Sequence, residues 1–131
     1  MVRVFIVEDH PLMRDMLLEF LALEEGIDVI GTAESAESAL EHLDGASTDL
    51  VLIDMSLPGM SGIELLGQLR QRYPDMRFAM LSGHGERHYV EQAFAAGASG
   101  YILKGEPDDV PRAIYRVLEG GRYMSAELLP R

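Results

Sequence analysis

The sequence predicts an α/β domain built on an open parallel β-sheet with helices on both faces. Five short apolar runs alternate with longer stretches of helical apolar spacing, and the runs cover residues 4–7, 27–30, 50–53, 78–81 and 101–103. The last three runs lack the polar alternation of a half-exposed strand, so we expect strands that are buried on both faces. Strict alternation of strands and helices predicts five βα units in one doubly wound sheet.

Helix boundaries are indicated by proline and by capping residues. Pro11 suits the first position of a helix, where its missing N–H group would have no partner. A capping-box pattern begins at Ser61 and predicts the start of the third helix. Pro107 and Pro111 cannot both occupy a first helical position, so we expect a turn at 107–109 and a last helix that begins close to Pro111.

Length and composition indicate one acidic globular domain. The chain has 131 residues, of which 47% are apolar and 25% are charged, a balance that excludes a disordered tail. Its formal net charge of −11 disfavours binding to nucleic acid or to anionic membranes. The sequence has no cysteine and only a short N-terminal apolar run, so we expect a cytoplasmic protein. We expect a domain over residues 1–121 and a tail, or the start of a linker, over 122–131.

Polar residues follow four of the predicted strands at the point where each strand ends. They are Glu8 and Asp9 after the first strand, Asp54 after the third, Ser82 after the fourth and Lys104 after the fifth; Gly83, next to Ser82, leaves room and offers its backbone N–H. Taken alone, each has a simpler explanation as a cap, a turn residue or a solvated lysine. Ligands of doubly wound sheets bind beyond the carboxyl ends of the strands, so the joint placement of these residues predicts a functional site.

Three carboxylates, a hydroxyl and an ammonium group suit metal-assisted phosphoryl chemistry. Carboxylates that lie close together repel one another unless a cation lies among them, and Mg²⁺ prefers carboxylate oxygens and water. A lysine beside an aspartate and a metal ion can neutralise a phosphoryl group, and the aspartate can itself form an aspartyl phosphate. The histidines have no spacing typical of a metal-binding set; they are His10, His42, His84 and His88.

Three segments carry a recognisable pattern: FIVEDHP at 5–11, LIDMSLPGMSG at 52–62 and GYILK at 100–104. Together they resemble the receiver domain of bacterial two-component response regulators, in order and at the family's usual spacing. The resemblance implies a flavodoxin-like fold with strand order 2-1-3-4-5. It also implies a phosphorylation-dependent signalling switch, which catalyses only its own phosphorylation and dephosphorylation.

The same resemblance implies how the acidic residues are used. Asp54 is the implied phosphoacceptor, and Asp9 and Asp54 are the implied direct ligands of Mg²⁺. The backbone carbonyl of Ser56 is the implied third protein ligand, and Glu8 acts through water. Many members of the family have Asp at the position of Glu8, and the family tolerates both residues.

A switch that responds to the phosphoryl group is implied as well. Lys104 pairs with the phosphoryl group, Ser82 supplies the switch hydroxyl where many members have Thr, and Tyr101 is the aromatic partner. We expect Ser82 to move inward and Tyr101 to rotate into the space that it leaves. The alternative is that packing fixes Tyr101 and the signal travels by another route. The face formed by the fourth helix, fifth strand and fifth helix would then change its affinity for a partner.

Residues 9–11, 96–101 and 120–125 narrow the resemblance to receivers of the LuxR/NarL type, which precede a helix-turn-helix output domain. That output domain is absent from this sequence, and we expect an excised receiver rather than a natural single-domain regulator. The implied partners are a sensor histidine kinase and, on phosphorylation, a second copy of the chain. DNA binding is implied only through the missing domain, and membrane binding is not expected.

Two other classes of protein share parts of this pattern. A Mg²⁺-dependent aspartate-nucleophile phosphatase of the haloacid dehalogenase type usually has a second Asp two residues after the nucleophile, where this chain has Ser56. A flavin-binding module needs a phosphate loop after the first strand, where Glu8 and Asp9 would repel the phosphate. An absorbance shift on adding flavin would identify the second class.

Overall fold

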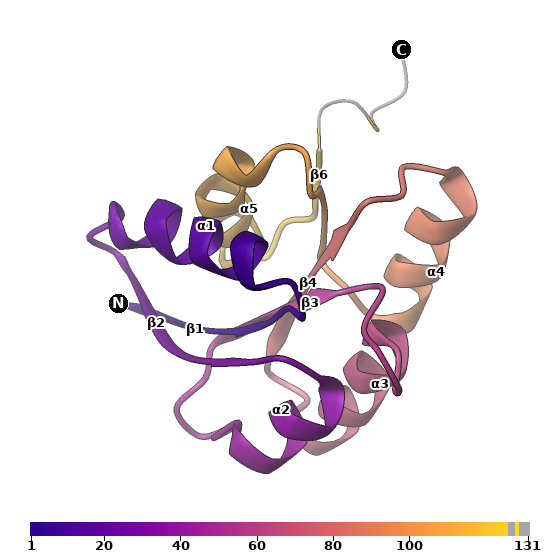
Figure 1. The fold of residues 1–131 in the computed structure, drawn as a ribbon, viewed down its shortest axis with the longest axis horizontal. Helices are drawn as coiled ribbons and strands as arrows, with labels where there is room; N and C mark the ends of the chain where they lie inside the picture. Colours follow the sequence, from indigo (N-terminus) through magenta and orange to yellow (C-terminus); the bar gives the residue numbers. More distant parts are fainter. Residues whose placement is uncertain (126–127, 129–131) are drawn as a thin grey trace.

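The fold is a parallel β-sheet between two layers of helices (Figure 1). The structure is a computed structural model and describes residues 1–125 and 128. The strands of this part of the chain are β1 (Val2–Val7), β2 (Ile27–Ala33), β3 (Leu50–Asp54), β4 (Arg77–Ser82), β5 (Gly100–Leu103) and β6 (Tyr123–Met124). They pair in the order β2-β1-β3-β4-β5-β6, and each pairing is parallel. The predicted α/β class and the strand order 2-1-3-4-5 are confirmed.

The helices cover the two faces of the sheet unequally. They are α1 (Pro11–Ala22), α2 (Ala36–His42), α3 (Gly62–Arg72), α4 (Arg87–Ala96) and α5 (Val110–Leu118). Helices α1 and α5 lie on one face, and α2, α3 and α4 lie on the other (Figure 1). Each face therefore has its own apolar core, and the ends of the central strands are left for polar residues.

Strand β3 contributes to both cores, as its continuous apolar run predicts. Its five residues are all buried. Side chains of a strand point alternately to opposite faces, so Val51 and Ile53 pack under α2, α3 and α4, whereas Leu50 and Leu52 pack under α1 and α5. The carboxyl group of Asp54, at the end of this strand, consequently projects from a backbone that is fixed by packing on both sides.

The predicted capping signals are present in the structure. The Ser61 hydroxyl accepts a hydrogen bond from the backbone N–H of Glu64 at 3.2 Å, which begins α3 as the capping box predicts. Residues Pro107–Asp109 form a single 3₁₀ turn, and Pro111 lies in the first turn of α5. Both prolines therefore occupy the positions that the sequence analysis predicts.

Strand β6 is an addition that the sequence analysis does not predict. It pairs with the edge of β5, where Tyr123 lies beside Gly100 and Met124 beside Tyr101. Ser125, directly after it, is fully buried. Regular structure thus continues past residue 121, while the division of the chain expected there stays a prediction.

Gly62 begins α3 at a point where a side chain has no room. A Cβ atom added there would overlap the backbone oxygen of Asp54. We expect Gly62→Ala to lower the free energy of unfolding by about 1–3 kcal/mol, because α3 or the end of β3 must shift. Gly67 lies on the same helix with open space at its Cβ position, so Gly67→Ala should raise the free energy by up to about 1 kcal/mol. Urea unfolding measures both, and equal effects would contradict the close contact.

Candidate functional site

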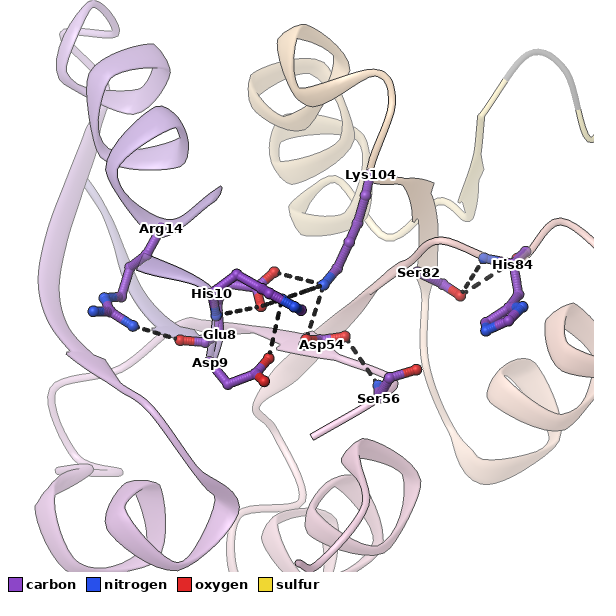
Figure 2. Close-up of polar contacts among 9 residues, drawn as sticks. All are labelled: Glu8, Asp9, His10, Arg14, Asp54, Ser56, Ser82, His84 and Lys104. Atoms are coloured by element: carbon purple, nitrogen blue, oxygen red, sulfur yellow. Dashed lines mark hydrogen bonds and ion pairs between the residues drawn. The ribbon is translucent and has the colours of Figure 1, made fainter. Parts of the chain in front are cut away.

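The strand order brings the predicted site residues to one edge of the sheet. Strand β1 lies beside β3, β3 beside β4 and β4 beside β5, and all of them run in the same direction. Their carboxyl ends therefore lie next to one another. The residues that meet there are Glu8, Asp9, Asp54, Ser82 and Lys104 (Figure 2).

Two ion pairs that share Lys104, one with Glu8 and one with Asp54, form the centre of the site. The Lys104 Nζ atom lies 2.9 Å from Asp54 Oδ2 and 3.0 Å from Glu8 Oε1. Both carboxylates are fully buried, whereas the lysine side chain is 17% exposed. Burial alone would lower the pKa of Lys104, but hydrogen bonds to Asp54 and Glu8 and their negative charges outweigh burial and raise it. Lys104 therefore remains an ammonium ion and compensates the buried negative charge.

Backbone contacts fix the two buried carboxylate residues further. The N–H group of Ser56 donates a hydrogen bond to Asp54 Oδ1 at 2.9 Å, so both oxygens of Asp54 have a donor. The Arg14 guanidinium donates to the backbone oxygen of Glu8 at 2.8 Å and fixes the start of the loop after β1. The carboxyl group of Asp54 is consequently held in one orientation before any ligand binds.

His10 belongs to the acidic cluster, which corrects the sequence analysis. Ligand atoms of Glu8, Asp9, His10 and Asp54 all lie within 4.8 Å of one another. The His10 Nδ1 atom lies 3.3 Å from Glu8 Oε2, 3.3 Å from Asp9 Oδ1 and 3.4 Å from Lys104 Nζ. The available signal was its position next to the acidic pair; spacing among histidines could not reveal it, because its neighbours in space are carboxylates.

The cluster has the composition of a site that could bind a metal ion. The Asp9 Oδ1 atom is buried; it lies 3.3 Å from His10 Nδ1 but accepts no hydrogen bond from any described residue. A carboxylate oxygen of Asp54 lies within 4.8 Å of a carboxylate oxygen of Asp9. Carboxylate oxygens of this kind are the ligands that hard divalent cations prefer. The donors present therefore fit such an ion.

Ser82 and Tyr101 meet at the backbone of His84 rather than at Asp54. The Ser82 hydroxyl accepts a hydrogen bond from the His84 N–H at 2.9 Å and lies 3.4 Å from the His84 carbonyl oxygen (Figure 2). The Tyr101 hydroxyl donates to the same carbonyl oxygen at 2.7 Å. Burial raises the pKa of Tyr101, which keeps the phenol protonated as the donor. Sequence analysis did not predict these contacts of His84, because its backbone makes them and any residue could supply that backbone.

The position of Tyr101 changes the expected order of switching events. We expected its ring to rotate inward after Ser82 moves, but the whole residue is already buried in this structure. Its ring packs in the core beneath α2, α3 and α4, and its hydroxyl is bonded to His84. Tyr101 therefore already lies inside the core in this structure, and its role in a switch stays a prediction.

Comparison with known proteins identifies the class to which this fold and site belong. The sequence matches the response regulator receiver domain family over residues 4–115, from β1 into α5. The chain belongs to this family, whose members are regulatory rather than catalytic proteins. This assignment replaces both alternatives, the haloacid dehalogenase type of phosphatase and the flavin-binding module.

The chain is most readily compared with regulators of the LuxR/NarL type. It is 31% identical over 97% of its length to the nitrate/nitrite response regulator protein NarL of Escherichia coli K12, and 35% identical over 94% to the transcriptional regulatory protein DegU of Brevibacillus brevis. It spans 59% and 52% of those proteins.

Comparison with solved structures also finds similarity to regulators of the LuxR/NarL type. A LuxR-family response regulator from Aurantimonas sp. SI85-9A1 is 32% identical, with a TM-score of 0.90 over 96% of this chain and 91% of that one. The receiver domain of the putative regulator NarL from Mycobacterium tuberculosis is 32% identical, with a TM-score of 0.84 over 91% and 97%. The predicted LuxR/NarL resemblance is confirmed. Within the described part of the chain, no helix has the length and apolar character needed to span a membrane.

Removal of the Lys104 ammonium group tests the ion pair. Lys104→Met retains an unbranched side chain but leaves two buried carboxylates without their cation. We expect the free energy of unfolding at pH 7 to fall by about 3 kcal/mol, the lower end for a buried pair, because Lys104 is partly exposed. Urea unfolding measures the loss. A loss below about 0.5 kcal/mol, typical of a surface ion pair, would contradict this account.

The raised pKa of Lys104 sets the pH range of this contribution. A group whose pKa is higher in the folded state stabilises the protein fully below its unfolded pKa, about 10.4 for lysine, and loses that effect as pH rises through the folded value. The stability difference between wild type and Lys104→Met should therefore stay constant from pH 7 to about 10 and shrink only above it. A decline between pH 7 and about 9 would contradict the raised pKa.

Proposed function

We propose that Asp54 accepts a phosphoryl group from the phosphohistidine of a sensor histidine kinase in a Mg²⁺-dependent reaction. The observation that carries this proposal is the orientation of its buried carboxyl group, held between the Lys104 ammonium and the Ser56 N–H at the edge of the sheet. Phosphoryl transfer needs little beyond a positioned nucleophile and compensation of charge. Asp54 and Lys104 have the chemistry to supply both.

The proposed transfer step forms one bond and breaks another. A carboxylate oxygen of Asp54 bonds to phosphorus while the bond from phosphorus to the imidazole nitrogen of the kinase breaks, and that nitrogen keeps the electron pair. Lys104 neutralises the charge on the transferred oxygens. The Ser82 hydroxyl donates to one of these oxygens, for which it must leave the His84 backbone. Hydrolysis of the acyl phosphate later resets the site.

Residues around the acidic cluster would hold the metal ion. Asp9 and Asp54 would be direct ligands, the Ser56 carbonyl would be the third protein ligand, and Glu8 would contact the ion through water. When bound, Mg²⁺ compensates the negative charge of the phosphoryl oxygens. Buried Asp9 Oδ1, which has no hydrogen bond to a described residue, supports its role as a ligand.

The proposed output is a change in the face formed by α4, β5 and α5. Phosphorylation adds close to two negative charges at the carboxyl ends of the strands. Lys104 compensates this charge, and the Ser82 hydroxyl donates a hydrogen bond to a phosphoryl oxygen. Because Ser82 and Tyr101 both contact His84, movement of Ser82 changes the segment that leads into α4. The name of DegU, a transcriptional regulatory protein, supports control of transcription, which we assign to a DNA-binding domain outside this sequence. Association of two phosphorylated copies is part of the same proposal.

Asp54→Asn tests the phosphoacceptor directly. The amide has nearly the same shape but is not a nucleophile, so incubation with a small phosphodonor and Mg²⁺ should leave the variant unlabelled while wild type gains one acid-labile phosphoryl group. Intact mass spectrometry measures the labelling. Asp75→Asn, at an exposed position on the opposite edge of the sheet, is the control and should be labelled like wild type. Full labelling of Asp54→Asn would refute the assignment.

Matched substitutions separate the two roles proposed for the acidic pair. Asp9→Asn removes a direct ligand and should weaken Mg²⁺ binding about tenfold or more, whereas Glu8→Gln should weaken it less than about fivefold. Calorimetric titration with Mg²⁺ measures both. Asp15→Asn, an exposed position on α1, removes the same charge outside the cluster and should have little effect. Equal losses for Asp9→Asn and Glu8→Gln would contradict the division of roles.

A further inference from the structure

The chain after α5 runs along the outer side of β5 and contacts both β5 and α4. We define residues 122–125 as the C-terminal clasp. The Arg122 guanidinium lies over the Phe94 ring of α4, 5.1 Å from its centroid. Residues 123–124 form β6 beside β5, and Ser125 is fully buried although its side chain is polar. The clasp therefore contacts both α4 and β5, on the side of β5 that faces away from β4.

Ser125 is bonded to the strand that carries Tyr101 and Lys104. Its hydroxyl accepts a hydrogen bond from the Leu103 N–H at 2.9 Å, and its own N–H donates to the Tyr101 carbonyl oxygen at 3.1 Å. The next residue, Lys104, donates its backbone N–H to the Ser82 carbonyl oxygen at 2.9 Å. A buried donor or acceptor that loses its partner is costly, so the position of the clasp and that of β5 depend on each other.

The loop between β4 and α4 lies between the site and the same C-terminal segment. On one side, His84 is held by the hydroxyls of Ser82 and Tyr101. On the other, Leu128 lies against Gly85, where an added Cβ atom would meet its Cδ2 atom at 3.1 Å. In its present conformation, the loop therefore donates a hydrogen bond to the Ser82 hydroxyl and also contacts Leu128.

We propose that the C-terminal clasp is an autoinhibitory contact: its docking on β5 and occupation of the Asp54 site oppose each other. The proposal rests on the proposed function, because a phosphoryl group must draw the Ser82 hydroxyl away from His84. The loop at 83–86 then loses the conformation against which Tyr101 and Leu128 are placed. A ligand shifts an equilibrium when it favours one of two conformations, and the coupling is reciprocal. Occupation of the site releases the clasp, and release of the clasp tightens binding at the site.

Beryllofluoride with Mg²⁺, a mimic of the phosphoryl group, tests this coupling in the full 131-residue chain. Ser125→Ala removes the acceptor of the Leu103 N–H, and Arg122→Gln removes the cation over Phe94 while leaving the buried bonds intact. We expect both variants to bind beryllofluoride more tightly than wild type, about three- to tenfold for Ser125→Ala and less for Arg122→Gln. Ser38→Ala, on α2 away from β5, is the control and should bind like wild type. Amide NMR titration measures the affinities.

Hydrogen exchange measures the reciprocal effect. In wild type, beryllofluoride and Mg²⁺ should speed exchange of the Leu103 and Ser125 amides about threefold or more, because both bonds belong to the docked clasp. If wild type binds the mimic but both variants bind it no more tightly, or if these amides exchange more slowly, the autoinhibitory contact is refuted and the proposed function stands. If wild type does not bind the mimic, both fail. Should Ser125→Ala not fold, Arg122→Gln decides the outcome.

Discussion

The ammonium group of Lys104 lies between two buried carboxylates, and the other features of the site depend on that ion pair. At an effective dielectric constant of about 20, an attraction over about 3 Å is worth roughly 5–6 kcal/mol, and repulsion between the carboxylates of Glu8 and Asp54 is of similar order. The balance is favourable only while the cation is present. Under the proposed function, a bound metal ion would compensate the same negative charge, and Lys104 would also contact the phosphoryl group.

The sheet makes this arrangement possible because it fixes the backbone and leaves the chemistry to strand ends. Strand β3 is buried along its whole length, so Asp54 has little freedom, whereas the loop after β4 is exposed from Gly83 to Glu86. Stability and responsiveness are thus separated along the chain. Under the proposed function, a charge added at Asp54 would leave the buried end of β3 in place, and the exposed loop that contains His84 would move.

Much of the fold was predictable from the sequence because burial on two faces leaves a simple pattern. The continuous apolar runs at 50–53 and 78–81 are typical of short strands that are buried on both faces. The alternation of strands and helices then predicts a parallel sheet. The prolines at 107 and 111 and the cap at Ser61 act locally, so their effects could also be inferred. Because parallel strands have their carboxyl ends on the same side of a sheet, the sequence also predicted that the residues after these strands lie close together.

The remaining features depend on contacts that sequence patterns do not encode. The backbone of His84 receives both Ser82 and Tyr101, and any residue type could supply that backbone. Strand β6 has only two residues, and the polar residues Arg122 and Ser125 flank it. It is therefore too short to show the alternation of a strand. The full burial of Tyr101 depends on side chains from α3, α4 and other strands that pack in the same core, and sequence periodicity does not encode such contacts.

The most direct test of the central claim is a crystal structure of the chain with Mg²⁺ and beryllofluoride. The account predicts beryllium bound to a carboxylate oxygen of Asp54, the metal ion between Asp9 and Asp54, and Lys104 Nζ in contact with fluoride. It also predicts the Ser82 hydroxyl turned from His84 toward the fluoride. A structure in which Lys104 keeps both carboxylates and beryllofluoride lies elsewhere would contradict the claim that this ion pair is the phosphoacceptor site.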